Sequence, residues 1–265
     1  MASYHSFCAL VITLSSILTM SLKANNDFIP RTYTSTDGKT LNYRIHIPAK
    51  ISTKKPCPLV LFLHGSGERG NDNTRQLIYG TPPLLAYSQK NNIPLIIVAP
   101  QCPEGESWVN SHTIPKKTTV PMMLTIELIQ KLITTLPVDT NRIYVTGLSM
   151  GGFGTWDIIQ RKPNMFAAAI PICGGGDTNM VSVIKNIPIW VFHGGSDGVV
   201  KTKHSQDMVA ALKNAGSKVK YTEYEGIGHF SWKRTYSNDK VLEWFLSQKK
   251  NAVQADTDCK SVPSQ

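Results

Sequence analysis

Six short apolar runs, separated by segments of helical length, constrain the fold of this chain more than any other feature. Most of these runs do not alternate apolar with polar residues, which is typical of parallel strands covered on both faces. The runs lie at 59–63, 95–99, 143–146, 167–172, 189–192 and 219–224. Between them, segment 122–136 has an apolar stripe of helical spacing, and segment 205–214 ends just before Gly216, a helix C-terminal signal. Because strand alternates with helix, the sequence predicts an α/β fold with a mostly parallel, doubly wound sheet.

An antiparallel hairpin is expected ahead of these runs. Asp37 and Gly38 form a turn signal between segments 31–34 and 41–47, and the second segment alternates apolar with polar residues. A hairpin that leads into a doubly wound sheet is the element order of the α/β-hydrolase fold.

The N-terminus indicates export. Residues 1–24 contain an apolar run and end before the polar residue Asn25, which predicts a signal peptide. An uncleaved anchor or a wrong start are the alternatives, because no Lys or Arg precedes the run. Residues 25–250 are then expected to form a single α/β-hydrolase domain, and the polar segment 251–265 a flexible C-terminal tail. These expectations place the protein outside the cytoplasm, either secreted or periplasmic.

Composition narrows the choice of partners. The formal net charge is +10, but Lys and Arg are scattered and not interleaved with aromatic residues, so no nucleic-acid partner is expected. No stretch beyond the N-terminus predicts stable membrane insertion. The five cysteines lack metal-site spacing, and Cys57 and Cys102 are expected at opposite edges of the sheet, too far apart for a disulfide. No metal or cofactor is expected, and the oligomeric state is left open.

A G-x-S-x-G motif at 147–151 supplies a candidate nucleophile, Ser149. The motif directly follows a predicted strand and opens a predicted helix, as a nucleophile elbow requires, because flanking glycines avoid clashes in that sharp turn. The serine hydroxyl is then exposed above the sheet at a helix N-terminus, where backbone amides favour a developing oxyanion.

The oxyanion hole is expected to combine two chain segments. The backbone N–H of Met150 is one donor, and the N–H of Ser66 or Gly67, in the glycine-rich segment 64–70, is the other. His64, which precedes a glycine at a strand end, is interpreted as a packing residue and is not assigned to the triad.

Asp197 and His229 complete the predicted triad as the orienting acid and the general base. Each follows a predicted strand, and the chain order serine, acid, histidine is that of α/β-hydrolases. Asp177 is the rival acid, one strand earlier. His193 and His204 are rival bases, interpreted as structural or exposed.

At these residues the sequence resembles the prolyl-oligopeptidase-like and dienelactone-hydrolase-like esterases, in particular secreted bacterial proteins often labelled predicted peptidases. The resemblance spans about residues 41–248 and is carried by the segments 59–70, 147–156, 171–177 and 221–229. It implies a hydrolase, and some members of the group act on plant cell-wall esters, including feruloyl and acetyl groups. The chain has no β-propeller, and segment 173–187 is too short for a lid domain, so peptidase activity is not favoured.

The predicted function is therefore hydrolysis of carboxylic esters through an acyl-enzyme, on a small-molecule or oligosaccharide ester. The alternatives are a serine peptidase acting on small peptides and a catalytically silent binding module. Trp108 and Trp232 are expected to line an open, shallow cleft that takes short or aromatic acyl groups, with ordinary packing as the other interpretation of both rings.

Overall fold

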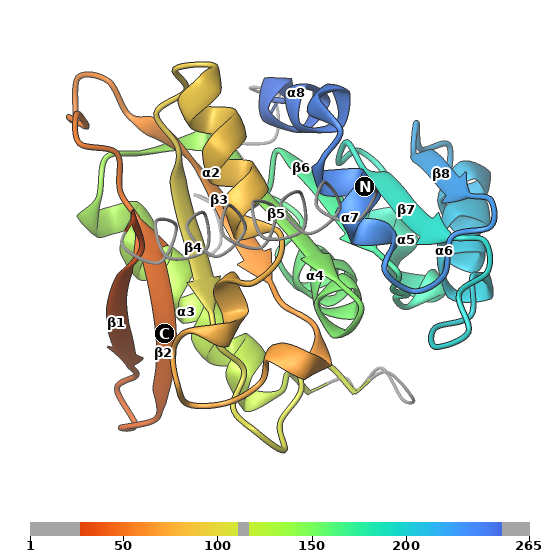
Figure 1. Ribbon diagram of the computed structural model, residues 1–265, viewed down its shortest axis with the longest axis horizontal. Coiled ribbons are helices and arrows are strands. Elements are labelled where there is room, and N and C mark those ends of the chain that lie inside the picture. The colour runs from red at the N-terminus through yellow and green to blue at the C-terminus, as the bar shows by residue number, and fades with distance from the viewer. Residues whose placement is uncertain (1–26, 111–116, 251–265) are drawn as a thin grey trace, which may run out of the picture.

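The computed structural model describes residues 27–110 and 117–250, and within them eight strands form one sheet (Figure 1). Its spatial order is β1-β2-β4-β3-β5-β6-β7-β8. The strands are β1 (Ile29–Thr34), β2 (Thr40–His46), β3 (Cys57–Leu63), β4 (Ile96–Pro100), β5 (Val138–Leu148), β6 (Ala168–Ile172), β7 (Trp190–Gly194) and β8 (Lys220–Tyr224). β2 runs antiparallel to β1 and β4, whereas all other neighbours are parallel. The predicted α/β-hydrolase architecture is confirmed.

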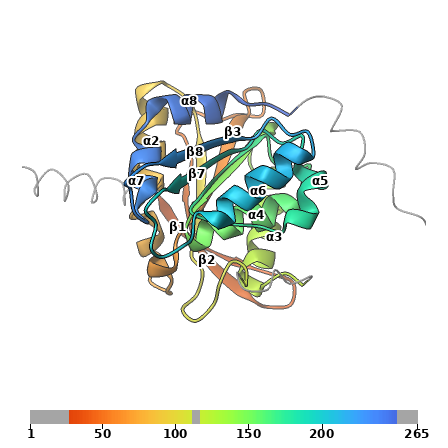
Figure 2. The same ribbon diagram turned by 90° about the vertical axis from the view of Figure 1, so that its right-hand side faces the viewer.

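Helices cover both faces of the sheet (Figure 2). One face carries α3 (Val120–Thr135), α4 (Met150–Arg161), α5 (Val181–Ile184) and α6 (Lys203–Asn214), and the other carries α2 (Thr81–Lys90), α7 (Ser231–Tyr236) and α8 (Asp239–Ser247).

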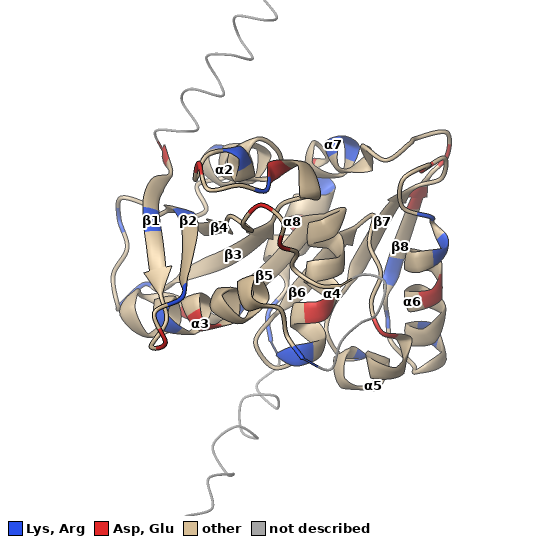
Figure 3. Cartoon of the chain, turned by 90° about the horizontal axis from the view of Figure 1, so that it is seen from below, with Lys and Arg blue, Asp and Glu red and all other residues tan. Residues whose placement is uncertain are grey.

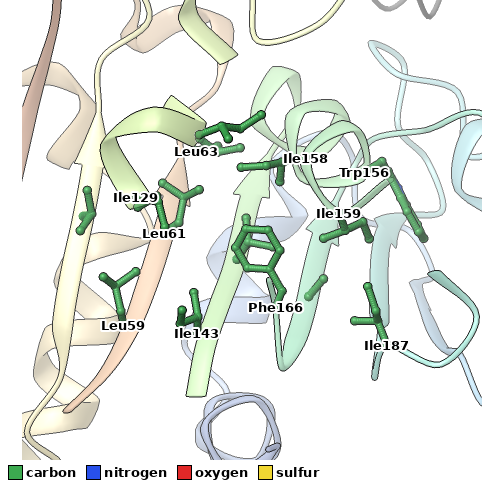
Figure 4. Packing of buried hydrophobic residues seen from close by; sticks show 14 of the residues in the cluster. Leu59, Leu61, Leu63, Ile129, Ile143, Trp156, Ile158, Ile159, Phe166 and Ile187 are labelled. Atoms are coloured by element: carbon green, nitrogen blue, oxygen red, sulfur yellow. The ribbon is translucent and has the colours of Figure 1, made fainter. Parts of the chain in front are cut away.

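Strand β3 shows why its sequence is continuously apolar. Leu59 and Leu61 pack into the core on the side of α3 and α4, and Val60 and Phe62 pack into the core on the side of α2 and α8. Figure 4 shows the first of these cores, with Trp156 of α4 among its large buried side chains. A strand covered on both faces has no solvent side on which polar residues are favoured.

Local signals set the ends of the helices predicted at 122–136 and 205–214. The Thr119 side chain accepts a hydrogen bond from the Met122 backbone N–H and caps the start of α3. Helix α6 ends before Gly216, whose φ of 83° lies in the left-handed region that favours glycine. Both helices begin two residues before their predicted starts, within the usual uncertainty of helix ends.

Strand β5 is longer than its apolar run predicts. It begins at Val138, which pairs with Cys57, before the register shifts between Cys57 and Leu59. The residues between Val138 and Ile143 are polar and at least partly exposed, so hydrophobicity gave no signal for this part of the strand.

The structure bears on only some of the predictions about the chain ends, membrane insertion and a lid. The predicted signal peptide 1–24 and tail 251–265 lie outside the described residues. In the described part of the chain, no helix is long and apolar enough to cross a membrane. Segment 173–187 contains only a 3-10 turn, η3 (Thr178–Met180), and the single turn α5, with no helical lid.

The structure also gives the positions of charged side chains and thiols. Basic and acidic residues are interspersed over the surface elements (Figure 3), as in the ion pair between Lys203 and Asp207 on α6. Cys57 and Cys102 are buried free thiols.

Phe245 on α8 provides a test of the core beneath that helix. Its side chain is fully buried, and its ring lies 5.2 Å from the ring of Tyr144 on β5. Phe245→Ala is expected to lower the free energy of unfolding by about 3–5 kcal/mol, measured by urea denaturation. The matched change Phe230→Ala, at a side chain that is 56% exposed, is expected to cost less than about 0.5 kcal/mol. Equal losses in the two variants would contradict the described packing.

Candidate active site

Ser149 is the single residue between the end of β5 and the start of α4. Its φ of 53° and ψ of −116° lie outside the favoured regions for a non-glycine residue, a strain that is typical of functional turns. The turn is held against its neighbours by direct backbone packing. A Cβ added at Gly151 would lie only 1.9 Å from the carbonyl oxygen of Leu63, so β3 leaves room for no side chain there. The tight strand-to-helix turn predicted for the elbow therefore requires glycine at this position.

Two loops at the same edge of the sheet bring His229 and Asp197 to the serine. Asp197 follows β7, and His229 follows β8 and immediately precedes Phe230, the N-cap of α7. The loops touch through their backbones, because a Cβ added at Gly194 would lie 2.1 Å from the carbonyl oxygen of Gly228. Neighbouring parallel strands end at one edge, and this brings residues distant in sequence together.

The three side chains form a continuous hydrogen-bonded chain. His229 Nε2 lies 2.9 Å from Ser149 Oγ, and His229 Nδ1 lies 2.7 Å from Asp197 Oδ2. The Asp197 side chain is fully buried, and that of His229 is 13% exposed. An imidazole bridged in this way can accept the serine proton at Nε2 while the carboxylate stabilises the positive charge that results.

Asp197 is held as a carboxylate by N–H donors. Burial alone would raise its pKa, but the bond from His229 and the backbone N–H groups of Val200 and Val199 outweigh that effect and hold the pKa below its usual value. The two backbone bonds, of 2.8 Å from Val199 and 2.9 Å from Val200, both end on Oδ1. Oδ2 is thus the oxygen turned toward the histidine.

The rival acid and two other histidines have local partners. The Asp177 carboxylate caps η3 by accepting the backbone N–H of Asn179 at 2.9 Å. His64 is buried, its Nε2 accepts the N–H of Cys102 at 2.9 Å, and burial lowers its pKa to about 4. His204 is exposed and lies against the ring of Phe153.

His193 is the residue whose role the sequence analysis missed. It is fully buried at the end of β7, and its Nε2 lies 3.2 Å from Asp197 Oδ2, the oxygen that also bonds His229. Its position four residues before Asp197 was the available signal, but a histidine in a strand end does not reveal its ring direction.

The predicted oxyanion donors lie in segments that contact each other. Ser66 and Gly67 are exposed in η1 (Ser66–Glu68), directly after β3, and Met150 begins α4, where its N–H has no acceptor within the helix. A Cβ added at Gly65 would lie 2.8 Å from the side chain of Leu148, so the two segments are in contact. Their role as oxyanion donors stays a prediction.

The expectation that Trp108 lines the cleft is wrong. Its ring is fully buried, and its Nε1 donates to the carbonyl oxygen of His64 at 3.0 Å. Its Cβ packs against Gly154, where an added Cβ would lie only 2.9 Å away. A ring enclosed in this way offers no face to a ligand, and it supports the loop after β3 instead.

Trp232 does lie beside the catalytic candidates, although only 4% of its surface is exposed. Its ring meets the His229 ring edge-on at 5.1 Å and the Tyr79 ring at 5.7 Å. It also lines a cavity of about 230 Å³ between α7 and the start of α2. The other residues around this cavity are Ile78, Tyr79, Gly80, Pro82, Pro83, Lys233, Tyr236 and Ser237. The indole Nε1 is buried with no hydrogen-bond partner among the described residues.

One cluster of metal-ligating residue types overlaps this site. Potential ligand atoms of Cys173, His193 and Asp197 lie within 4.8 Å of one another. Cys173 Sγ already lies 2.8 Å from Ser231 Oγ, and both nitrogens of His193 and both oxygens of Asp197 have hydrogen-bond partners. The donor set therefore favours a hydrogen-bonded network over a metal centre.

A strained serine after β5, an acid after β7 and a histidine after β8 define this fold and site as those of an α/β-hydrolase. The comparison with family models then identifies the family. The chain belongs to the dienelactone hydrolase family, whose model matches residues 113–255.

Individual relatives are also hydrolases by name. A bifunctional acetylxylan esterase/xylanase of Neocallimastix patriciarum is 26% identical over 68% of this chain and 26% of that protein. Feruloyl esterase D of Neurospora crassa is 24% identical over 63% of this chain and 57% of that protein. The solved structure of a thermostable esterase is 41% identical and has a TM-score of 0.80, covering 86% of this chain and 64% of that one. The chain thus spans about a quarter of the acetylxylan esterase/xylanase and less than two thirds of the thermostable esterase.

Gly151 provides a test of the elbow. Gly151→Ala would force its Cβ into the Leu63 carbonyl, so we expect a loss of stability of about 1–3 kcal/mol and a displaced Ser149. Thermal unfolding and covalent labelling of the serine by a fluorophosphonate measure these two effects. Gly198→Ala is the control, because no atom lies within 4 Å of the added Cβ and φ there is not positive. Wild-type stability and labelling in both variants would contradict the described close packing.

Proposed function

We propose that this protein is a serine esterase, which hydrolyses carboxylic esters through an acyl-enzyme. The observation that carries the proposal is the hydrogen-bonded chain from Ser149 through His229 to Asp197. Ser149 Oγ attacks the ester carbonyl as His229 Nε2 takes its proton, and the imidazolium then donates that proton to the leaving alcohol. A water molecule, deprotonated by the same nitrogen, releases the acid from Ser149.

The oxyanion hole in this proposal combines the Met150 N–H with the N–H of Ser66 or Gly67. The contact between the segment of η1 and the elbow, together with the helix N-terminus at Met150, supports this pairing of donors. These donors act on the tetrahedral intermediate, in which the carbonyl oxygen carries the negative charge.

We propose short or aromatic acyl esters as substrates, such as those on plant cell-wall polysaccharides. The named activities of the acetylxylan esterase/xylanase and feruloyl esterase D support this class. The cavity beside Trp232 supports the aromatic acyl group, since its aromatic walls, Tyr79, Trp232 and Tyr236, favour a planar ring. The expected site of action, outside the cytoplasm, rests on the predicted signal peptide.

The triad assignment is tested by substitution. Ser149→Ala is expected to lower kcat at least about a thousandfold, and Asp197→Asn about three to four orders of magnitude, because the asparagine no longer holds the required histidine tautomer. Asp177→Asn is the matched control and is expected to retain nearly wild-type kcat. The measurement is hydrolysis of 4-nitrophenyl acetate. A Ser149→Ala variant with more than about a tenth of wild-type kcat, or greater damage from Asp177→Asn, would reject the assignment.

The substrate proposal is tested with a series of esters and one matched pair of variants. We expect activity on 4-nitrophenyl esters to fall from acetate to palmitate, without activation at an interface, and methyl ferulate and a feruloylated oligosaccharide to be hydrolysed. Trp232→Leu removes an aromatic wall of this cavity and is expected to lower kcat/KM for methyl ferulate about 5- to 10-fold more than for 4-nitrophenyl acetate. Trp156→Leu, at a buried indole that does not line this cavity, is expected to leave that ratio unchanged. A maximum at palmitate would indicate a lipase, and cleavage of peptide amides with no action on esters would indicate a peptidase.

A further inference from the structure

We propose that His193 is a positioning residue of the triad: its Nε2–H is a second hydrogen-bond donor to Asp197 Oδ2, and it holds the carboxylate in the orientation that bonds His229. The inference rests on the proposed function, because it assigns a role within the same triad. It concerns a residue that does not touch the reacting atoms and acts through Asp197.

Both oxygens of the Asp197 carboxylate have N–H groups beside them. Asp197 Oδ1 is occupied by the N–H groups of Val199 and Val200, and Oδ2 lies 2.7 Å from His229 Nδ1 and 3.2 Å from His193 Nε2. The side chains of Asp197 and His193 are both fully buried. With four N–H groups around it and no water-exposed surface, the carboxylate has little freedom to rotate.

The contacts of His193 Nε2 indicate which ring nitrogen carries a hydrogen. Its Nε2 lies 2.9 Å from the carbonyl oxygen of Val200, which can only accept a hydrogen bond, so Nε2 carries a hydrogen. The same nitrogen lies 3.2 Å from Asp197 Oδ2, and in this proposal its hydrogen bridges both acceptors. Burial lowers the pKa of His193, while the Val200 carbonyl and Asp197 oppose that shift to a smaller extent. Burial therefore favours the neutral ring, which in this proposal donates from Nε2.

Ser205 anchors the other side of the His193 ring. His193 Nδ1 lies 2.8 Å from the hydroxyl oxygen of Ser205, which is buried on α6. The same oxygen lies 2.9 Å from the carbonyl oxygen of Gly174, so the single hydroxyl proton serves two acceptors. The anchor fixes the plane of the His193 ring from α6 and thus directs Nε2 toward Asp197.

Two donors on one carboxylate oxygen have a functional consequence. They divide its negative charge, so His193 orients Asp197 and also limits how strongly Asp197 stabilises a positive charge on His229. The other titratable groups that face His193 are Cys173 at the end of β6 and Glu223 on β8, whose carboxylate is bonded by Tyr221 and Gln206. Removing the His193 N–H leaves the whole charge to His229, which favours the imidazolium and weakens the base at low pH.

A pair of side chains of equal length tests this role. In His193→Gln the amide nitrogen can take the place of Nε2 and keep the donor, whereas His193→Met fills similar space without one. We expect His193→Met to lower kcat on 4-nitrophenyl acetate roughly 10- to 100-fold with KM changed less than about twofold. The acid limb of its kcat/KM profile, measured from about pH 5 to about pH 9, is expected to move to higher pH by about half a unit.

His193→Gln is expected to stay within about threefold of wild-type kcat with an unmoved acid limb. His204→Gln, at the exposed histidine of α6, is the control and is expected to match wild type. If His193→Met does not fold, Ser205→Ala replaces it, with a smaller loss of kcat and the same direction of pH shift, because the ring loses its anchor but keeps its N–H.

The proposal is overturned if the Met variant has wild-type kinetics, or if the Met and Gln variants lose kcat equally with the acid limb unmoved. It is also overturned if Ser205→Ala, used in place of an unfolded Met variant, shows no shift. Failure of the proposed function is separate, because it appears as residual turnover in Ser149→Ala regardless of His193.

Discussion

Backbone packed directly against backbone at the end of β5 is the constraint on which the site depends. The position of Gly151 places the start of α4 on the carbonyl group of Leu63, and a Cβ added at Gly152 would lie 2.2 Å from the carbonyl oxygen of Ile172. The turn is thus wedged between β3 and β6, and Ser149 has to adopt a strained conformation to connect strand and helix. The strain of one residue is offset by the packing of α4 on the sheet, which buries ten of the twelve residues of that helix.

The electrostatics of the site follow from the same arrangement. The loops after β7 and β8 cross in backbone contact at Gly194 and Gly228, which buries Asp197 among N–H donors. A buried carboxylate is costly unless it is hydrogen-bonded, and here the donors are numerous enough to keep its pKa below the usual value. The serine side of the site remains partly exposed, because Ser149 is only partly buried and the His229 side chain is 13% exposed. The acid is therefore shielded from water while the nucleophile is open to a substrate.

The cavity at Trp232 shows how the two faces of the sheet differ in use. Trp232 and Tyr236 belong to the core shared with α2 and α8, yet Trp232 also touches His229. The aromatic residues of α7 thus link the hydrophobic core on the side of α2 and α8 to the candidate active site. On the opposite face, α3, α4 and α6 pack Trp156 and its neighbours into a continuous core, and that face supports the elbow from below.

The alternation of strands with helices, the hairpin and the three triad candidates were determined by the sequence itself, because apolar runs, turn residues and the glycine-flanked serine act through local chemistry. Strand ends were readable for the same reason, and they placed Asp197 and His229 at one edge of the sheet. Helices α2, α7 and α8 were not predicted. The direction of individual rings was not readable: Trp108 turned inward to His64, and His193 turned toward Asp197. Those directions depend on contacts between segments distant in sequence, such as the anchor of His193 on Ser205 of α6, which exist only once the sheet has brought its loops together.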